Sequence, residues 1–505
     1  MKQFFITIAG VFVGLVIFFV GLPFLLIVSA IGAARPEPTP AAAVLTLDLR
    51  EGLSDQSASN PFASFGAGQS VMEIVRTLDR AERDPKVKGL FIRLPETGMA
   101  PAAAEELAQA VHDFRRAGKR VTAHSQGFLP VGVITATYRL GAAADELWLQ
   151  DGAPFDAVGV ASEEVFLKGL FDRYGIVPDF ERRAEYKNAV NPYLYTDFTP
   201  EHREATLSWL GSVHGSAVAA AARDRRQDPA AMRTILEAGP YLAADARARR
   251  LVDQLGQVEQ AEEALLDRFG EDAELVELSA YEPAEERGLN RRPTIAVVEA
   301  EGPILTGDGD SAGFGAGQTI YSDVIARALY DAAEDESVKA VVFRISSPGG
   351  SATASDQILA ALNGVKKAGK PVVVSMGTYA ASGGYWIASQ ADRIVAQPST
   401  LTGSIGVFGG KLAIGPALER FGVNLESVRV GGEFASAYQA ESGFTPGQRA
   451  AISAQIDQTY RPGRGGGARP GLDRRPGARA GLGGRARRLR NGGCRRQAAS
   501  QDRRR

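Results

Sequence analysis

Cysteine and histidine are both scarce in this chain of 505 residues, and each scarcity excludes a kind of site. The single cysteine, Cys494, can form no disulfide within the chain, and zinc sites that need two or more cysteines are excluded with it. The four histidines all lie before residue 215. A histidine base for a nucleophile in the later part of the chain would therefore have to come from a distant part of the sequence.

Lysine is absent from the last 45 residues, 461–505, although the segment is strongly basic. It holds 15 Arg and 2 Asp, a net charge of +13, so the formal net charge of −2 leaves −15 for the first 460 residues. An acidic body of this kind does not indicate nucleic-acid binding. We expect no nucleic-acid partner.

Apolar periodicity is also missing from this tail, since 35 of its 45 residues are Arg, Gly, Ala or Pro. Codons made only of G and C encode these four residue types. We therefore predict that 461–505 is a GC-rich reading frame translated out of register, and that it is disordered. The alternative is a basic disordered tail that binds acidic lipid or RNA.

Charge is absent near the N-terminus, where residues 4–28 are almost wholly apolar. A run of about 25 residues exceeds the ~20 that span a bilayer as a helix and the ~7–15 of a cleaved signal peptide's core. We predict a signal-anchor over 1–34, followed by a linker at 35–43. Lys2 before the span favours a cytosolic N-terminus. A cleaved signal peptide is the alternative.

The body of the chain is a tandem duplication, with one copy at 44–281, a second at 294–460 and a linker at 282–293. Matching segments keep their order at a spacing of 246–251 residues. Three of the matches are VKGLFIRL (87–94) with VKAVVFRI (338–345), RRAGKRV (115–121) with KKAGKPV (366–372), and FTPEHR (198–203) with FTPGQR (444–449). An internal repeat of this length predicts two domains of the same fold.

Each copy alternates strand and helix patterns, which predicts an α/β fold. The runs at 294–300, 339–345 and 370–376 are short, β-branched and almost continuously apolar. This is the pattern of strands buried on both faces of a parallel sheet. Residues 354–370 have helical periodicity, and Gly369 is placed to end that helix.

Two glycine-rich loops follow strands of the second copy: SSPGGS at 346–351 and YAASGGYW at 379–386, which contains Ser382. Ligands of parallel sheets bind at the carboxyl ends of strands, and Gly-Gly turns can direct N–H groups at an oxyanion. The first copy has LPETGMA at 94–100 and Thr135 at the position of Ser382. The scaffold therefore does not require the serine, which favours a catalytic role for it in the second copy.

A serine nucleophile needs a base, and residue spacing leaves the base open. A Ser-His-Asp arrangement would need a histidine from the first copy. A lysine could serve if burial lowered its pKa toward neutrality. Lys187 lies in AEYKNAVNPY at 184–193, although by itself it is typical of a solvated surface lysine.

Four motifs together, SPGGS, YAASGGYWIAS, STLTGSIGVFG and EYKNAVNPY, resemble the long, duplicated form of signal peptide peptidase A, a bacterial membrane-anchored serine protease family. The resemblance implies Ser382 as nucleophile, Lys187 as general base and Ser404 as the residue that positions the lysine. It implies that the N–H groups of Gly383 and Gly350 bind the oxyanion. It also implies tandem Clp protease/crotonase-like domains, built from repeated β-β-α units. Asp392 matches Asp145 of the first copy, so we expect a structural role for both.

The same resemblance implies an endopeptidase that degrades remnant signal peptides and other apolar peptides in the bacterial inner membrane. Its body would face the periplasm, it would need no cofactor or metal, and it would form a homo-oligomeric ring such as a tetramer. Two alternatives stay open: an inactive scaffold, because the second copy loses its repeat pattern after Tyr460, and a crotonase-like acyl-CoA enzyme.

Overall fold

The computed structural model describes residues 3, 10, 12, 14–22, 39–56, 69–281, 293–309 and 318–460. The predicted tail, most of the predicted anchor and nearly all of the 282–293 linker lie outside these residues, so those three assignments stay predictions. A short π-helix, η1 (Ile17–Gly21), lies within the described part of the anchor. None of the helices within the described ranges combines the length and the apolarity needed to cross a bilayer.

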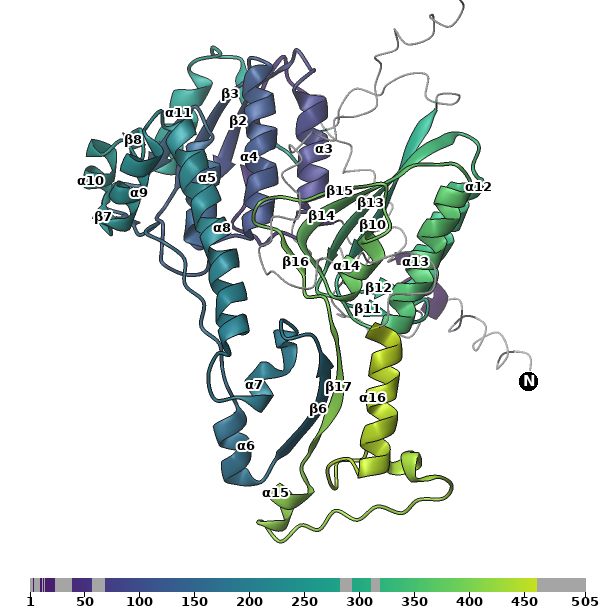
Figure 1. Cartoon of the computed structure of the whole chain (residues 1–505). Helices are drawn as coiled ribbons and strands as arrows, with labels where there is room; N and C mark the ends of the chain where they lie inside the picture. Colours follow the sequence, from purple (N-terminus) through teal and green to yellow (C-terminus); the bar gives the residue numbers. More distant parts are fainter. Residues whose placement is uncertain are drawn as a thin grey trace, which may run out of the picture.

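The first copy is built around a six-stranded parallel sheet with the strand order β8-β4-β3-β2-β1-β9 (Figure 1). Its strands are β1 (Ala42–Asp48), β2 (Val87–Arg93), β3 (Arg120–Ser125), β4 (Glu146–Leu149), β8 (Gln254–Leu255) and β9 (Ala273–Glu277). The short strands β5 (Pro154–Phe155) and β7 (Tyr241–Leu242) pair with each other beside this sheet.

The helices of the first copy pack on this sheet and on one another. They are α3 (Val71–Ala81), α4 (Pro101–Arg116), α5 (Ile134–Ala142), α6 (Lys168–Tyr174), α7 (Asn191–Leu194), α8 (Pro200–Asp224), α9 (Pro229–Glu237), α10 (Ala243–Ala248) and α11 (Val258–Leu266), with the 3-10 helix η2 (Asn188–Val190). α3 begins where the Ser70 hydroxyl accepts a hydrogen bond from the Glu73 N–H, and it buries Ile74 and Leu78 in the core.

The second copy has a five-stranded parallel sheet in the order β10-β13-β14-β15, with β16 also paired to β14. Its strands are β10 (Thr294–Glu301), β13 (Val338–Ser347), β14 (Val372–Ala381), β15 (Arg393–Val395) and β16 (Leu401–Gly403), beside the pair β11 (Ile304–Leu305) and β12 (Ile320–Tyr321). Its helices are α12 (Ser322–Glu334), α13 (Ala352–Lys367), α14 (Gly383–Ala388), α15 (Gly415–Glu419) and α16 (Pro446–Tyr460), with the 3-10 helix η3 (Glu433–Ser436). The predicted mixed α/β fold with parallel sheets is therefore confirmed.

Two details of the sequence prediction for the second sheet are wrong. The run at 294–300 was expected to be buried on both faces, but it forms β10, an edge strand whose Ile295 and Val297 are exposed. β14 does not end before Gly377 but continues to Ala381, because its last residues gain β16 as a partner. The helix expected at 354–370 is present as α13, and Gly369 follows it with φ +78°.

Asp145 and Asp392 make the same contact in the two copies. Asp145 accepts a hydrogen bond from the Val121 N–H at 2.9 Å, and Asp392 accepts one from the Val372 N–H at 2.8 Å. Each carboxylate thus joins the strand that follows it to the start of the neighbouring strand. The contact is repeated in a copy without the serine, in accord with the structural role expected for both residues.

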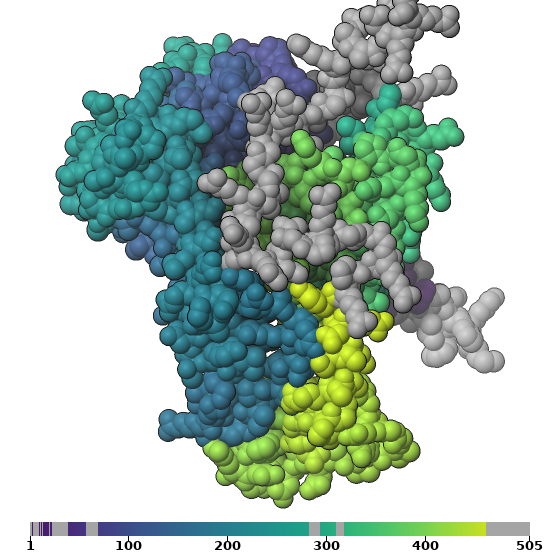
Figure 2. All heavy atoms as spheres, in the orientation of Figure 1, coloured from purple at the N-terminus to yellow at the C-terminus, as the bar shows by residue number. Residues whose placement is uncertain are grey.

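The two copies are joined below the sheets by an antiparallel ribbon of β6 (Val177–Arg183) from the first copy and β17 (Val407–Ala413) from the second. α16 packs on both strands of this ribbon (Figure 1). In the space-filling view, blue atoms of the first copy and yellow-green atoms of the second lie side by side along this lower part (Figure 2). The ribbon therefore carries segments of one copy directly to the other.

Candidate active site

Ser382 lies at the turn from β14 into α14. Its backbone has φ +53° and ψ −117°, an uncommon conformation for a residue with a side chain, and its N–H donates to the Gly403 carbonyl at 2.9 Å. Gly349, with φ +104°, lets the SSPGGS loop approach, because a Cβ there would come within 2.7 Å of Ser382 Cβ. The sharp turn fixes the hydroxyl at the carboxyl end of the sheet.

Lys187 points its amine directly at this serine. The Nζ atom lies 2.8 Å from Ser382 Oγ, 3.0 Å from the carbonyl oxygen of Ser404 and 3.2 Å from Ser404 Oγ. The side chain is only 2% exposed, and this burial lowers the pKa of Lys187 from 10.5 to about 8. A substantial fraction of the amine is therefore neutral at mildly alkaline pH, and a neutral amine can accept a proton.

Residues 187 and 382 meet because of the β6·β17 ribbon. Its register places Arg183 opposite Val407, so the residues just beyond both strands are also brought together. The backbone turns at Ala184 and Ser404, both with positive φ, and directs Lys187 toward Ser404. Gly406 is needed for the approach, since a Cβ there would lie 2.6 Å from the Arg183 carbonyl oxygen. In this structure the Ser-Lys pair forms within one chain.

Gly350 and Gly383 bring two backbone N–H groups together beside the serine. A Cβ on Gly383 would lie 3.3 Å from the Gly350 nitrogen, and one on Gly350 would lie 2.2 Å from the Ile304 carbonyl oxygen. Only glycine fits this closely packed site. The Gly383 N–H is at the first position of α14, where no intrahelical acceptor exists. Two N–H groups in such a place can bind a developing negative charge.

The loop that carries Ser404 is held by the first copy. Trp209 Nε1 of α8 donates to the Ser399 carbonyl at 3.1 Å, and Ser212 Oγ donates to the Pro398 carbonyl at 2.7 Å. On the other side, Thr402 Oγ1 donates to the Ala380 carbonyl of β14 at 2.8 Å. These contacts fix Ser404 relative to both copies.

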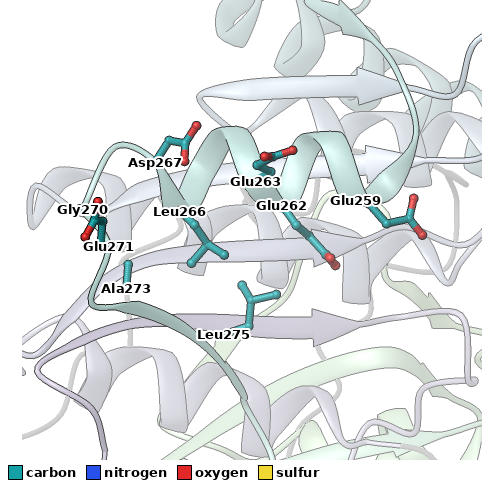
Figure 3. Close-up of a pocket in the computed structure, with 9 residues that line it drawn as sticks. All are labelled: Glu259, Glu262, Glu263, Leu266, Asp267, Gly270, Glu271, Ala273 and Leu275. Atoms are coloured by element: carbon teal, nitrogen blue, oxygen red, sulfur yellow. The ribbon is translucent and has the colours of Figure 1, made fainter.

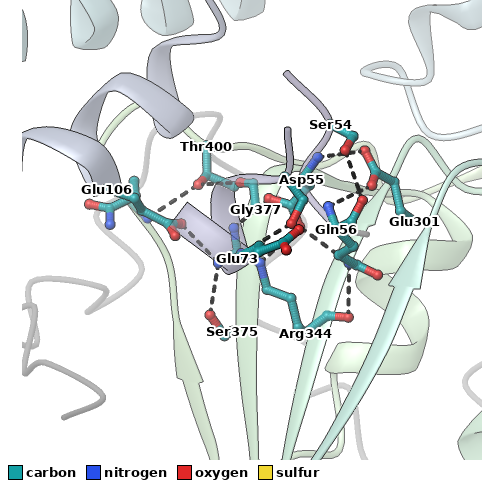
Figure 4. Close-up of polar contacts among 12 residues, drawn as sticks. Ser54, Asp55, Gln56, Glu73, Glu106, Glu301, Arg344, Ser375, Gly377 and Thr400 are labelled. Carbon is teal, nitrogen blue, oxygen red and sulfur yellow. Dashed lines mark hydrogen bonds and ion pairs between the residues drawn. The ribbon is translucent and has the colours of Figure 1, made fainter. Parts of the chain in front are cut away.

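A buried ion network that sequence reasoning missed also joins the copies (Figure 4). Arg344 of β13 forms two hydrogen bonds to the Asp55 carboxylate, one of them at 2.9 Å, and a third to Glu106 of α4 at 2.8 Å. The same guanidinium donates to Ser375 Oγ of β14 at 3.0 Å. Burial raises the pKa of Glu106. The network lies on the two strands that lead to the Gly350 and Ser382 loops, so it positions both.

The sequence held one signal for this network. Arg344 interrupts an apolar strand run, and the repeat places Arg93 at the matching position of the first copy. Arg93 donates to the Gln126 side chain at 3.0 Å instead. Its acidic partners could not be found from sequence, because Asp55 and Glu106 belong to the other copy.

The four histidines make their contacts elsewhere in the first copy. His112 lies beside Asp224, His214 beside Glu237, and His124 Nε2 is 3.1 Å from the Gly256 carbonyl oxygen. His202 packs against Phe198 and Phe166. The position beside Ser382 that a histidine base would need is taken by Lys187.

A surface depression of the first copy is lined by residues 259–275 and does not include Ser382 (Figure 3). It has a volume of about 460 Å³ and lies between α11 and β9 of the first copy. Five of its lining side chains are acidic: Glu259, Glu262, Glu263, Asp267 and Glu271. Within the described ranges, no group of three or more potential ligands converges as a metal site would require.

Comparison with known proteins gives a family. The sequence profile of peptidase family S49 matches residues 113–269 and 364–462. Protease 4 of Haemophilus influenzae is 34% identical over 379 residues, which cover 71% of this chain and 59% of that protein. The chloroplastic serine protease SPPA of Arabidopsis thaliana is 28% identical over 398 residues, 77% of this chain and 57% of that protein. The chain thus spans less than two thirds of the length of either relative.

Among solved structures, a membrane-bound stomatin-specific protease with a bound substrate peptide overlaps 48% of this chain and 93% of its own. The identity is 7% and the TM-score is 0.27. The fold is therefore described from the two sheets above and not from this similarity. The family match covers about half of the sequence and includes segments of both copies. The chain belongs to peptidase family S49.

Proposed function

We propose that this chain is a serine endopeptidase with a Ser382–Lys187 dyad. The observation that carries the proposal is the 2.8 Å contact between Lys187 Nζ and Ser382 Oγ, made by a lysine whose pKa burial lowers to about 8. A base within hydrogen-bond reach of a nucleophile, with a pKa lowered toward neutrality, is suited to general-base catalysis. Membership of peptidase family S49 supports the same reaction class.

In the proposed first step, neutral Lys187 accepts the Ser382 proton while Oγ attacks the peptide carbonyl carbon. The carbonyl oxygen becomes negatively charged and accepts hydrogen bonds from the Gly383 and Gly350 N–H groups. The Lys187 ammonium then returns its proton to the leaving amine, and an acyl-enzyme remains. A water attacks this ester and loses a proton to Lys187, and Lys187 then returns that proton to Ser382 Oγ as the acid leaves.

Ser404 is the proposed positioning residue for the base. Its carbonyl and hydroxyl oxygens both accept from Lys187 Nζ, which leaves the nitrogen lone pair of the neutral amine available for the serine proton. The positive φ of Ser404 lets both oxygens approach the amine.

We propose apolar peptides, and remnant signal peptides in particular, as substrates. Tyr379, Leu401, Ile405 and Phe408 lie next to the dyad in the chain or in the sheet, and all four are exposed. Burial of apolar peptide side chains against them would be favourable. By the resemblance of its motifs, we propose a site at the bacterial inner membrane with the body toward the periplasm, in a homo-oligomer.

A serine-directed fluorophosphonate probe tests the dyad in the detergent-solubilised full chain. We expect wild type to be labelled, and Ser382→Ala and Lys187→Ala to lose at least ~100-fold in labelling rate, because one lacks the nucleophile and the other its base. Ser389→Ala and Lys411→Ala are matched controls, since Ser389 donates to the Trp386 carbonyl and Lys411 to the Gln439 carbonyl.

Equal labelling of wild type and both dyad variants would refute the proposal. Wild type without any labelling would favour the inactive scaffold. A crotonase-like enzyme is distinguished by retention of acyl-CoA turnover in Lys187→Ala, because that chemistry does not need the Ser–Lys contact.

A further inference from the structure

Glu105 and Glu106 are neighbours on α4 of the first copy, and each carboxylate contacts the second copy. Successive residues of a helix point about 100° apart, so the two side chains reach different elements. Glu106 binds Arg344 of β13, the strand that leads to the Gly350 loop (Figure 4). Glu105 contacts instead the loop between β15 and β16, which leads to Ser404.

The Glu105 carboxylate is buried and accepts hydrogen bonds from three donors. Its side chain is 1% exposed. One oxygen pairs with the Arg139 guanidinium of α5 and accepts from Ser216 Oγ of α8 at 2.9 Å. The other oxygen accepts from the Ser399 N–H of the second copy at 3.4 Å. Because Arg139 balances the charge, the second oxygen is available for a contact between the copies.

Both backbone polar groups of Ser399 are bonded by the first copy. Glu105 accepts from its N–H, and Trp209 Nε1 of α8 donates to its carbonyl at 3.1 Å. The next residue, Thr400, donates its hydroxyl to the Gly377 carbonyl of β14 at 2.9 Å. The loop is therefore fixed immediately before β16 begins.

The short strand β16 connects this loop to both members of the dyad. It spans only Leu401–Gly403 and pairs with the end of β14. At its end the Gly403 carbonyl accepts from the Ser382 N–H at 2.9 Å. The next residue, Ser404, presents both of its oxygens to Lys187 Nζ. A shift at the start of so short a strand would be passed on to its end.

The matching residues of the second copy lie at the surface instead. At a spacing of 251 residues, the pair is replaced by Asp356 and Gln357 of α13. Both are exposed, and Gln357 donates to Asp323 of the same copy at 2.7 Å. The repeated scaffold therefore does not require two carboxylates here, which favours a role for them at the junction of the copies.

We propose that Glu105 is a positioning residue for the dyad, and that it acts through Ser399 and β16 on Ser404. Glu106 acts separately, through β13, on the Gly350 loop that binds the oxyanion. Two adjacent residues of α4 thus hold the base side and the oxyanion side of the site by different routes. The inference rests on the proposed Ser–Lys mechanism and adds to it a residue that lies outside all four sequence motifs.

Glu105→Gln tests this role with little change in side-chain volume. Arg139 and the Ser399 N–H approach different oxygens of the carboxylate, whereas an amide offers one oxygen and one NH2 group. The guanidinium makes the stronger bond and should take the oxygen, so the Ser399 N–H would face another donor. The substitution therefore breaks the contact between the copies while the side chain keeps its size.

The readout is the rate of fluorophosphonate labelling as a function of pH. We expect Glu105→Gln to lower the rate by ~10–100-fold, the cost of a small displacement at a reacting site. The midpoint of the pH profile should move down by ~0.5 unit or more, because the Ser404 oxygens that stabilise the Lys187 ammonium move away. A chain that is only less stable would keep the wild-type midpoint. Asp356→Asn is the matched control, and its labelling rate should stay within ~twofold of wild type.

Coupling to Ser404 tests the route of the effect. In wild type, Ser404→Ala should lower the labelling rate at least ~tenfold. In a Glu105→Gln background the same substitution should lower it less than ~twofold, because the hydroxyl is already displaced. In a Glu106→Gln background it should keep its full effect. An equal effect of Ser404→Ala in wild type and in Glu105→Gln would overturn the proposal, as would an unchanged or raised pH midpoint in Glu105→Gln.

Hydrogen exchange of the full chain, measured by mass spectrometry, tests the contact without reference to catalysis. We expect Glu105→Gln to raise the exchange rate of the amides in 399–403 at least ~tenfold. Asp356→Asn should change this rate less than ~twofold. Trp209→Phe is a second variant, needed if Glu105→Gln does not fold. It keeps an aromatic ring, loses the bond to the Ser399 carbonyl, and should raise the same exchange rate and lower the labelling rate.

The outcomes separate the positioning role from the proposed protease. Unchanged exchange in 399–403 in both Glu105→Gln and Trp209→Phe would overturn the positioning role. If exchange rises as expected but wild type is not labelled, the contact with the loop is upheld and only the proposed protease is refuted.

Discussion

The two parallel sheets of this protein come from one duplicated sequence, yet their surroundings differ. In the first sheet, β8 and β9 cover the two edges, and α11 packs with Val44 and Phe91 on one face. In the second, no counterpart of β8, β9 or α11 is present among the described residues, and Ile295 and Val297 are exposed. The sheet that carries the serine is the less protected one.

The two copies therefore contribute different parts of the candidate site. Among the described residues, the first copy has β8, β9 and α11 without counterparts in the second, and it provides the proposed base, the α8 contacts and the acidic partners of Arg344. The second provides the serine and the glycine loops. Because Lys187 belongs to one copy and Ser382 to the other, the proposed site depends on the contact between the copies.

The largest expected difference in the rate of peptide hydrolysis is between substitutions at the two matched hydroxyl positions, Ser382 and Thr135. Ser382→Ala should lower peptide hydrolysis by about 10⁴–10⁶-fold, the usual result of removing a catalytic nucleophile. Thr135→Val should leave the rate within about twofold, because Thr135 is buried in the other copy and only its hydroxyl is lost. Initial rates on an apolar fluorogenic peptide measure both. Loss of activity in Thr135→Val alone would reverse the assignment.

A smaller effect is expected when the matched arginines are compared by urea unfolding. Arg344→Met should destabilise the chain by about 3–5 kcal/mol, because Asp55 and Glu106 would be left buried without their cation. Arg93→Met should cost less than about 1 kcal/mol, since Arg93 bonds only to Gln126 among the contacts described. Equal costs would contradict the view that Arg344 joins the two copies.

The lysine site predicts both a pH–rate profile and a stability change. The rate should rise as the pH increases through about 8, where Lys187 becomes neutral. A rate that instead followed a group near pH 6.5 would favour a histidine base.

The free energy of unfolding should also depend on the protonation of Lys187. The pKa of Lys187 is lower in the folded chain than its ordinary value of 10.5, so the unfolded chain binds more protons between pH 8 and 10.5. Burial of the ammonium therefore costs stability below pH 8, and the cost falls as the pH rises. Lys187→Met should gain about 3 kcal/mol at pH 7. Lys367→Met, at an exposed lysine of α13, is the control.

The smallest expected difference is in the free energy of unfolding, and it is between two matched residues on the faces of the two sheets, Val44 and Ile295. Val44→Ala should cost about 1–2 kcal/mol, because it opens a cavity under α11. Ile295→Ala, at the matching position of the second sheet, should cost less than about 0.5 kcal/mol, because that side chain is already exposed. Thermal unfolding of both variants measures the pair. A large cost at Ile295 would mean that another element covers β10.

Much of the fold could be predicted from the sequence because it depends on local patterns. Apolar runs with β-branched residues gave the positions of β13 and β14, and helical periodicity gave α13 up to Gly369. β10 was misjudged because an apolar run does not reveal whether a neighbouring strand exists. The end of β14 was misjudged because its last pairing partner, β16, lies twenty residues further along the chain.

The candidate site likewise combines features that follow from the sequence with features that depend on the tertiary structure. The sequence by itself determined that Ser382 and two glycine loops follow parallel strands, that the matching copy lacks them, and that no histidine is nearby in the chain. Only the tertiary structure decided that Lys187 reaches Ser382, that burial lowers its pKa, and that Arg344 finds its acidic partners in the other copy. The reason is that distance, burial and electrostatics depend on the register of the β6·β17 ribbon, which pairs residues more than two hundred positions apart.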